Sequence, residues 1–212
     1  MSYLIVGSGS DGNCIIYKDV IMVDVGLPYN KIVEYLPKIK LILLTHKHSD
    51  HFNPTSIARI GKEFPNIILV VPDHLVGEVH AIDYSGRIFI AMTPQKYKVG
   101  NILVESFPLD HDVENVGWKI VIDRFKIIHA TDTKSLDGVE AKRFDLYAIE
   151  HNFDEEIINE TIRRKLLDGA YAHEIRTKET HLSFQKANAW IESQRAIDSE
   201  VVMLHISSSY LE

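Results

Sequence analysis

The residues with the clearest chemical capacity are three histidines and one aspartate in the segment T-H-K-H-S-D-H, residues 45–51. This segment directly follows the apolar run Leu41–Leu44, which predicts a buried strand. Neutral imidazole is the commonest protein ligand for zinc-like ions, and a carboxylate supplies the negative charge that a divalent ion needs. A solvated loop has no reason to concentrate these residue types. The predicted metal ligands are His46, His48, Asp50 and His51.

Further ligand-type residues stand at the ends of other strand-like runs. His111 follows F-P-L-D, Asp132 follows F-K-I-I-H-A-T, and His205 ends V-V-M-L-H. Glu150 closes the run D-L-Y-A-I-E, and His181 lies in T-H-L-S. Because the loops at strand ends often carry functional side chains, His111, Asp132 and His205 are candidates to complete the site.

Other acidic and histidine residues have simpler interpretations. Asp24 ends an early strand, where it either caps a turn or braces a metal ligand. Asp110 and Asp112 flank His111 and are expected to be loop carboxylates. The histidines expected to be structural or surface residues are His74, His80, His129 and His173.

The elements that must position these side chains alternate between strand and helix. Strands are expected at residues 3–6, 14–17, 21–24, 41–44 and 67–71, and β character returns from residue 87 with a turn at Gly100–Asn101. Amphipathic spacing and end signals predict helices at residues 55–64, 154–168 and 184–191. His46 and His48 therefore lie on a strand-to-helix loop, and Asp50 and His51 lie near the helix start.

Length and composition are those of an ordinary globular protein. The chain has 212 residues, of which 45% are hydrophobic and 25% charged. A single domain spanning residues 1–212 is the default expectation, although two closely packed halves would also fit. The first residues lack the features of a signal peptide, and no apolar run approaches the roughly 20 residues that cross a bilayer. We therefore expect a cytoplasmic protein without a membrane partner.

Charge and cysteine content exclude several classes of site. The formal charge of -7 argues against a protein that grips long nucleic acid mainly by charge. Cys14 is the single cysteine, which excludes an internal disulfide and any zinc site built from several thiolates. Its apolar setting, N-C-I-I-Y, predicts a buried small hydrophobe rather than a reactive thiol.

The segment G-S-G-S-D-G-N at residues 7–13 satisfies the dinucleotide-binding pattern G-x-G-x-x-G. That pattern binds a pyrophosphate only when a helix follows the loop. Here the short, β-branched run C-I-I-Y follows, which predicts a strand. The segment is therefore interpreted as a loop between two strands.

The pattern His-x-His-x-Asp-His, followed by a lone His, a lone Asp and a lone His, resembles the metallo-β-lactamase superfamily of metal-dependent hydrolases. The segments G-S-G-S-D-G-N, E-H-N, T-H-L-S and L-H-I-S look most like its phosphodiesterase branches, which include ribonuclease Z, related bacterial nucleases and cyclic-phosphate phosphodiesterases. The resemblance implies an α/β fold, specifically a four-layer α/β-β/α sandwich. It also implies that each half of the chain contributes metal ligands.

Carried over by position, the resemblance implies two divalent ions, zinc in the first instance, with manganese or iron as alternatives. One ion would be held by His46, His48 and His111, and the other by Asp50, His51 and His205. Asp132 would bridge them, and Asp24 would steady the ligand loops.

The resemblance also implies attack on phosphorus by a hydroxide held between the two ions. The implied catalytic residues are Asp50, which orients this hydroxide, and His181, which donates a proton and is oriented by Glu150. The expected function is hydrolysis of a nucleic acid end or of a small nucleotide-like phosphodiester, including cyclic ones. Dimers are common among similar enzymes, so a homodimer is the assembly to test.

Two alternatives remain at this level. The same chemistry would open a lactam, thioester or lactone, although Asp132 stands where many true β-lactamases carry a cysteine. A protein that kept the fold and lost turnover would instead be a metal- or nucleotide-binding module. His151 and Phe153 depart from the nuclease-like pattern, and no long basic insertion resembles the arm with which ribonuclease Z holds transfer RNA.

Overall fold

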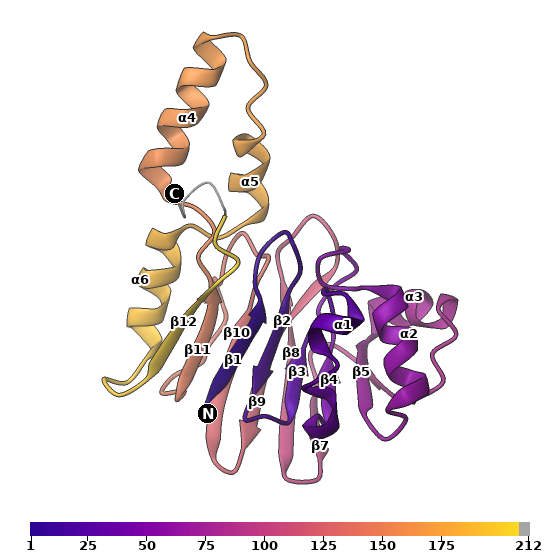
Figure 1. Cartoon of the computed structure of the whole chain (residues 1–212). Helices are drawn as coiled ribbons and strands as arrows, with labels where there is room; N and C mark the ends of the chain where they lie inside the picture. The colour runs from indigo at the N-terminus through magenta and orange to yellow at the C-terminus, as the bar shows by residue number, and fades with distance from the viewer. Residues whose placement is uncertain (208–212) are drawn as a thin grey trace. The chain divides into compact units, whose positions relative to one another are not determined.

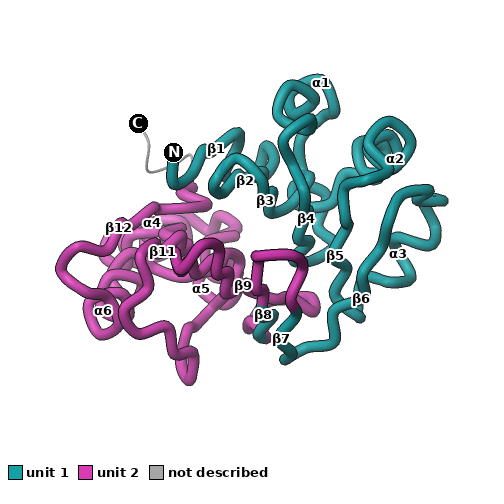
Figure 2. The backbone as a smooth tube through the Cα atoms, turned by 90° about the horizontal axis from the view of Figure 1, so that it is seen from below, with its two compact units in different colours: residues 1–97, 105–107 teal, residues 98–104, 108–212 magenta. Residues whose placement is uncertain are grey.

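A computed structural model describes residues 1–207 of the chain. The backbone divides into two compact units, coloured separately in Figure 2. Unit 1 comprises residues 1–97 and 105–107, and unit 2 comprises residues 98–104 and 108–212.

Unit 1 is built on a six-stranded sheet with the strand order β1-β2-β3-β4-β5-β6. Its strands are β1 (Tyr3–Gly7), β2 (Cys14–Tyr17), β3 (Ile21–Val23), β4 (Leu41–Leu43), β5 (Ile68–Pro72) and β6 (Arg87–Ala91). The first three strands pair antiparallel, and β3 to β6 pair parallel. Because parallel strands end at the same edge, the loops after β3 and β4 leave the sheet side by side.

The helices of unit 1 cover this sheet (Figure 1). They are α1 (Tyr29–Ile32), α2 (Pro54–Glu63) and α3 (Val76–Ala81), with the 3-10 turns η1 (Leu36–Lys38) and η2 (Asp73–Leu75). In α2, Ile57 and Ile60 are buried in one core cluster with Ile42 of β4 and Leu69 of β5. The helix begins where Asn53 accepts a hydrogen bond from the Ser56 backbone N–H at 3.0 Å.

The second sheet has the strand order β12-β11-β10-β9-β8-β7. Its strands are β7 (Lys96–Val99), β8 (Ile102–Leu109), β9 (Asn115–Ile122), β10 (Phe125–Ala130), β11 (Leu146–Glu150) and β12 (Glu200–Leu204). The expected turn between β7 and β8 is present, and Gly100 adopts a φ of 61° there. The strands β10, β11 and β12 pair parallel, so their carboxyl ends share one edge.

Three helices follow β11 in unit 2, namely α4 (Glu155–Leu167), α5 (Glu174–Thr180) and α6 (Phe184–Gln194). Figure 1 shows α6 alongside β11 and β12, and its residues Ala187 and Ile191 are buried. Side chains of Asp154 and Ser183 cap the first turns of α4 and α6. The sequence predicted α4 and α6 but not α5, a helix of seven mostly polar residues in which only Thr180 is buried.

None of the helices within residues 1–207 combines the length and the apolar character required to cross a bilayer.

The expected burial of Cys14 is confirmed, because its side chain is fully enclosed in the core of unit 1. Burial, together with the charge of Asp24, raises the pKa of this thiol far above its ordinary value.

We predict that Cys14 does not react with Ellman's reagent in the folded protein. The thiolate is the reactive form, and both burial and the raised pKa suppress it. One thiol per chain should appear only when the protein is unfolded in guanidinium, and the absorbance at 412 nm reports both conditions. Fast labelling of the native protein would contradict the enclosed position of this residue.

Candidate functional site

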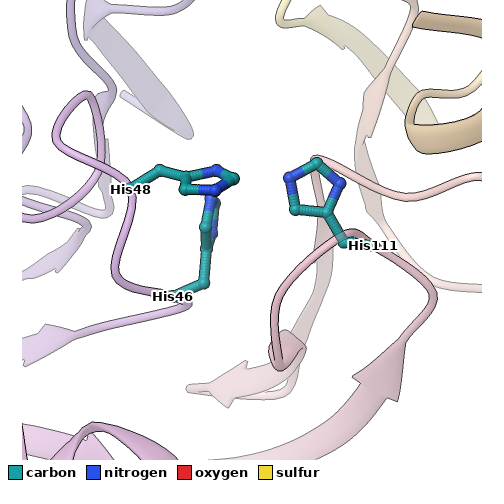
Figure 3. Close-up of side chains that lie close together, drawn as sticks. All are labelled: His46, His48 and His111. Atoms are coloured by element: carbon teal, nitrogen blue, oxygen red, sulfur yellow. The ribbon is translucent and has the colours of Figure 1, made fainter. Parts of the chain in front are cut away.

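The histidine-rich segment of unit 1 forms the loop between β4 and α2. His46 and His51 are buried, while His48 and Asp50 are partly exposed. The ring of His46 lies 4.8 Å from that of His48 and 4.2 Å from that of His51, measured between centroids. Figure 3 draws His46 and His48 on this loop. The three imidazoles predicted as ligands in this unit are therefore gathered at one place.

A buried carboxylate, Asp24, orders this loop from the end of β3. Its Oδ1 accepts a hydrogen bond from the Thr45 backbone N–H at 2.8 Å. Its Oδ2 accepts bonds from the Thr45 hydroxyl at 2.8 Å and from Nδ1 of His51 at 2.7 Å. Burial raises the pKa of Asp24, against the opposing effects of His51 and Thr45. The interpretation of Asp24 as a brace for the ligand loop is supported by these three contacts.

The Asp24 network fixes which nitrogen of each histidine carries a proton. His51 donates from Nδ1 to the carboxylate, so its Nε2 carries the lone pair. The Thr45 hydroxyl donates to Asp24 and therefore accepts from Nδ1 of His46, 3.0 Å away. Both imidazoles thus keep the lone pair on Nε2, and His51 has the carboxylate–histidine arrangement that is common at metal sites.

Asn13, at the end of the glycine-rich segment, joins the same loop. Its amide nitrogen donates to Oδ2 of Asp50 at 3.2 Å and lies 2.8 Å from Nε2 of His51. Its backbone N–H donates to the Asp50 carbonyl at 2.6 Å. A Cβ atom on Gly26 would lie 1.7 Å from that carbonyl, so only glycine permits this close approach of the two chain segments.

Unit 2 brings a second set of ligand-type side chains together at one sheet edge. Asp132, Glu150, His181 and His205 each offer a ligand atom, and these atoms all lie within 4.8 Å of one another. Oδ1 of Asp132 lies 3.4 Å from Nδ1 of His181 and 3.4 Å from Nε2 of His205. Three of the four residues lie at the ends of the parallel strands β10, β11 and β12 or within two residues beyond them, which explains their convergence.

Glu150 and His181 form the closest pair in this group. Oε1 of the fully buried Glu150 lies 2.6 Å from Nδ1 of His181. Its Oε2 accepts from the backbone N–H groups of Thr133 at 2.9 Å and Leu182 at 3.2 Å. Burial lowers the pKa of His181, but the hydrogen bond and charge of Glu150, with the charge of Asp132, outweigh it and raise the pKa overall.

His111 and His205 are each oriented by a contact from a distant segment. Nδ1 of His111 donates to the carbonyl of Thr180, the last residue of α5, at 2.9 Å. This bond leaves the lone pair of the His111 ring on Nε2. Figure 3 also draws the His111 side chain. The amide nitrogen of Asn152 lies 3.0 Å from Nδ1 of His205 and donates to the His205 carbonyl at 2.9 Å.

Three of the candidate residues adopt backbone conformations that favour glycine. The φ angles are 60° at Asp24, 55° at Asp132 and 52° at His205. Each residue lies just beyond the end of its strand, where the chain turns sharply. Aspartate and histidine adopt this region more often than most residues, but it still costs each of them conformational energy of order 1 kcal/mol. Such strain persists where the surrounding structure holds it, and it is concentrated at functional sites.

These arrangements fit bound metal ions. Nε2 of His46, His51 and His111 carries the lone pair, and Asp132 and Asp50 supply carboxylate oxygens. Sequence patterns assigned no role to Asn13, Thr45, Asn152 or Thr180. The first three offer only a polar side chain as a signal, and Thr180 acts through its backbone carbonyl.

The comparison with protein families decides the relationship. Residues 23–206 match the beta-lactamase superfamily domain. The chain belongs to this superfamily. The resemblance found in the sequence is therefore confirmed, and membership of the superfamily implies divalent metal binding.

Among curated proteins, the chain is similar to the exodeoxyribonuclease WalJ of Streptococcus pneumoniae strains D39 and R6. Identity is 28% over 175 residues, which cover 74% of this chain and 64% of each relative. The chain thus spans somewhat less than two thirds of the length of these superfamily members. The match supports the phosphodiesterase branches of the superfamily.

Two solved structures show the same fold. The human short-form tRNase Z has a TM-score of 0.70 at 17% identity, covering 100% of this chain and 95% of that protein. YhfI of Bacillus subtilis, a metallo-β-lactamase fold protein, has a TM-score of 0.70 at 17% identity, with coverage of 97% and 85%. These matches confirm the predicted fold class, the α/β-β/α sandwich of the metallo-β-lactamase type.

We predict that Asp24→Asn weakens zinc binding by about 10- to 100-fold. The asparagine oxygen can keep the bond from the Thr45 N–H, but its NH2 group then faces Nδ1 of His51. His51 must move its proton to Nε2, the nitrogen that we assign to the metal. Competition with a chromophoric chelator measures the affinity. The lost hydrogen bonds should also cost about 1–3 kcal/mol of stability in urea unfolding.

Asp19→Asn is the matched control for this substitution. Asp19 is exposed and has a φ of 58°, close to that of Asp24, so the same change removes a charge without touching the ligand loop. Equal zinc affinity for the Asp24→Asn variant and the native protein would show that Asp24 does not set the tautomer of His51.

Proposed function

We propose that this protein is a metal-dependent phosphodiesterase acting on nucleic acid ends or on small nucleotide phosphodiesters. The observation that carries the proposal lies in unit 2, where the ligand-type atoms of Asp132 and His205 and those of the carboxylate–histidine pair Glu150–His181 all lie within 4.8 Å of one another. Such a pair beside a metal-type ligand set supplies both parts of ester hydrolysis, namely activation of the attacking oxygen and protonation of the leaving one.

We assign the metal ligands as the superfamily pattern implies. By this pattern His46, His48 and His111 would hold one divalent ion, Asp50, His51 and His205 would hold the second, and Asp132 would be shared by the two. Zinc is the first choice, because imidazole and carboxylate ligands suit it, although manganese and iron accept the same donors. When bound, such ions polarise a phosphoryl oxygen and make a hydroxide nucleophile available near neutral pH.

The protein's own side chains then orient the attacking oxygen and protonate the leaving oxygen. Asp50 accepts a hydrogen bond from the attacking oxygen and directs it towards phosphorus. Glu150 holds Nδ1 of His181, so that the opposite nitrogen of the ring points to the leaving oxygen and donates its proton. Asp24 and Thr45 keep the ligating histidines in one tautomer throughout.

The name of the WalJ relatives favours DNA ends within this substrate class, although the present chain matches only part of their length. We therefore assign a DNA end as the first substrate to test. A cytoplasmic location and a homodimeric assembly stay predictions.

The proposal is tested with metal-replete protein on bis(p-nitrophenyl) phosphate, and then on labelled single-stranded DNA, RNA and cyclic nucleotides side by side. We expect hydrolysis of the chromogenic diester, its loss after treatment with a chelator, and recovery when zinc or manganese is returned. Elemental analysis of the native protein identifies the metal and its stoichiometry.

Two outcomes would reject the proposal. A metal-replete protein that opens a lactam, thioester or lactone but cleaves no phosphodiester has the same fold with another substrate. A protein that binds metal and turns over none of these substrates is a binding module.

A further inference from the structure

A cavity of about 570 Å³ lies within unit 2, and its lining includes a residue next to His181 in the sequence. Its walls come from the loop after β10, which includes Lys134 and Leu136, and from α6, which includes Lys186 and Trp190. Leu182, the neighbour of His181, closes one side. This volume is in the range of pockets that enclose small organic ligands.

The aromatic wall of the cavity is held in a fixed orientation. Nε1 of Trp190 donates to the Val139 carbonyl at 3.2 Å. The Trp190 ring lies edge-on to Tyr147, with 6.1 Å between ring centroids, and the Tyr147 hydroxyl donates to the Ala141 carbonyl at 2.5 Å. A partly exposed indole fixed in this way offers a preformed surface on which a flat ring can stack.

Charged groups complete the lining. Lys186 and Trp190 are four residues apart on α6, so they lie on the same face of the helix, with about 6 Å between their Cβ atoms. Lys134 is paired with Glu179, with 2.5 Å between Nζ and Oε2, and carboxylates are present at Asp110 and Asp137. A cation beside an aromatic plane fits an anionic group joined to a flat ring, and the carboxylates are acceptors for N–H groups on that ring's edge.

The cavity is tied to the candidate catalytic residues through the backbone. The Leu182 N–H, which belongs to its wall, donates to Oε2 of Glu150 at 3.2 Å. The N–H of Lys134, another wall residue, donates to the Asp110 carbonyl at 2.8 Å, and Asp132 lies two residues before Lys134. A ligand in this cavity is therefore held by the same loops that carry Asp132 and His181.

We propose that this cavity binds the nucleoside adjoining the scissile phosphate, with its base stacked on Trp190 and a phosphate near Lys186. The inference rests on the proposed phosphodiesterase function and specifies its substrate as one that carries a base. Trp190 is then a specificity-determining residue that acts on binding, away from the reacting atoms.

The test compares the binding of 2′-deoxyadenosine 5′-monophosphate and 2-deoxyribose 5-phosphate, which differ by the base, by calorimetry on the full chain. Stacking of one base on an aromatic side chain predicts a preference of roughly 5- to 150-fold for the nucleotide. Trp190→Ala should remove this preference, and Trp190→Phe should keep most of it. Lys186→Ala should weaken both ligands about two- to fivefold, whereas Lys142→Ala, an exposed lysine outside the cavity, should change neither.

A second variant guards against loss of structure in Trp190→Ala. Ala189 is an exposed helical residue that lines the cavity, so Ala189→Leu narrows the space without removing any packing. It should lower affinity for the nucleotide more than for the sugar phosphate. Equal binding of the two ligands by the native protein, or a preference that survives in both Trp190→Ala and Ala189→Leu, would overturn the inference. Because binding is measured without turnover, this result is independent of whether the protein hydrolyses phosphodiesters.

Discussion

Replacing Asp132 with asparagine should reduce kcat/KM for phosphodiester hydrolysis by about 10³-fold or more, equivalent to about 4 kcal/mol of transition-state stabilisation. Asp132 is almost fully buried, and its Oδ1 lies 3.4 Å from a ring nitrogen of both His181 and His205. An amide nitrogen cannot ligate a cation, and the neutral side chain removes the charge shared by the two proposed ions. Metal content should fall from two ions per chain to one or fewer, as measured by elemental analysis.

Asparagine is the informative substitution at this position because of the backbone. The φ of 55° at Asp132 is tolerated by asparagine, whereas alanine there adds a conformational cost unrelated to metal binding. The amide oxygen can also keep the hydrogen bond from the Thr131 hydroxyl, 3.1 Å long in the native protein.

Asp123→Asn provides the matched control for the Asp132 substitution. Asp123 has a φ of 49° and an exposed side chain in the turn between β9 and β10. Its substitution should leave both metal content and activity unchanged. An Asp132→Asn variant with the full metal complement and native activity would reject Asp132 as the bridging ligand.

Glu150→Gln should lower kcat on single-stranded DNA by about 10²- to 10³-fold. The glutamine oxygen can keep the bonds from the Thr133 and Leu182 N–H groups, which places its NH2 group against Nδ1 of His181. Two N–H groups cannot share a hydrogen bond, so the imidazole must turn or move its proton. In either case the proposed donor is no longer held towards the leaving oxygen.

Substrates with different leaving groups distinguish the orientation of a proton donor by Glu150 from a purely structural role of this residue. A sugar alkoxide needs a proton as it departs, whereas p-nitrophenolate is stabilised by its own nitro group. The loss caused by Glu150→Gln should therefore be much smaller on bis(p-nitrophenyl) phosphate than on DNA. His181→Gln should show the same difference, and the double variant should be no worse than either single one, because the pair acts as a unit.

The exposed Glu156 on α4 supplies the control substitution for Glu150, since Glu156→Gln removes the same charge away from the site. Equal losses on the two esters, or losses that multiply in the double variant, would show that Glu150 maintains the structure of the site without orienting an acid.

Much of the fold followed from local patterns. The apolar run at residues 41–44 and the capped, amphipathic segment after Asn53 predicted β4 and α2 because strand and helix periodicity are properties of neighbouring residues. The short helix α5 escaped prediction, since it has little apolar character and its carbonyl contact with His111 joins residues 69 positions apart.

The sequence by itself determined which side chains are available for chemistry, namely three histidines and an aspartate in seven residues, and later single residues at the ends of predicted strands. Tertiary structure decided how these side chains are held. The contact between Asp24 and His51 spans 27 positions, and that between Glu150 and His181 spans 31. Such contacts depend on which strand ends share a sheet edge, here through parallel pairing of β3 with β4 and of β10 with β11. Residue type is local information, whereas hydrogen-bond partners and tautomers are set by segments that meet only in the folded chain.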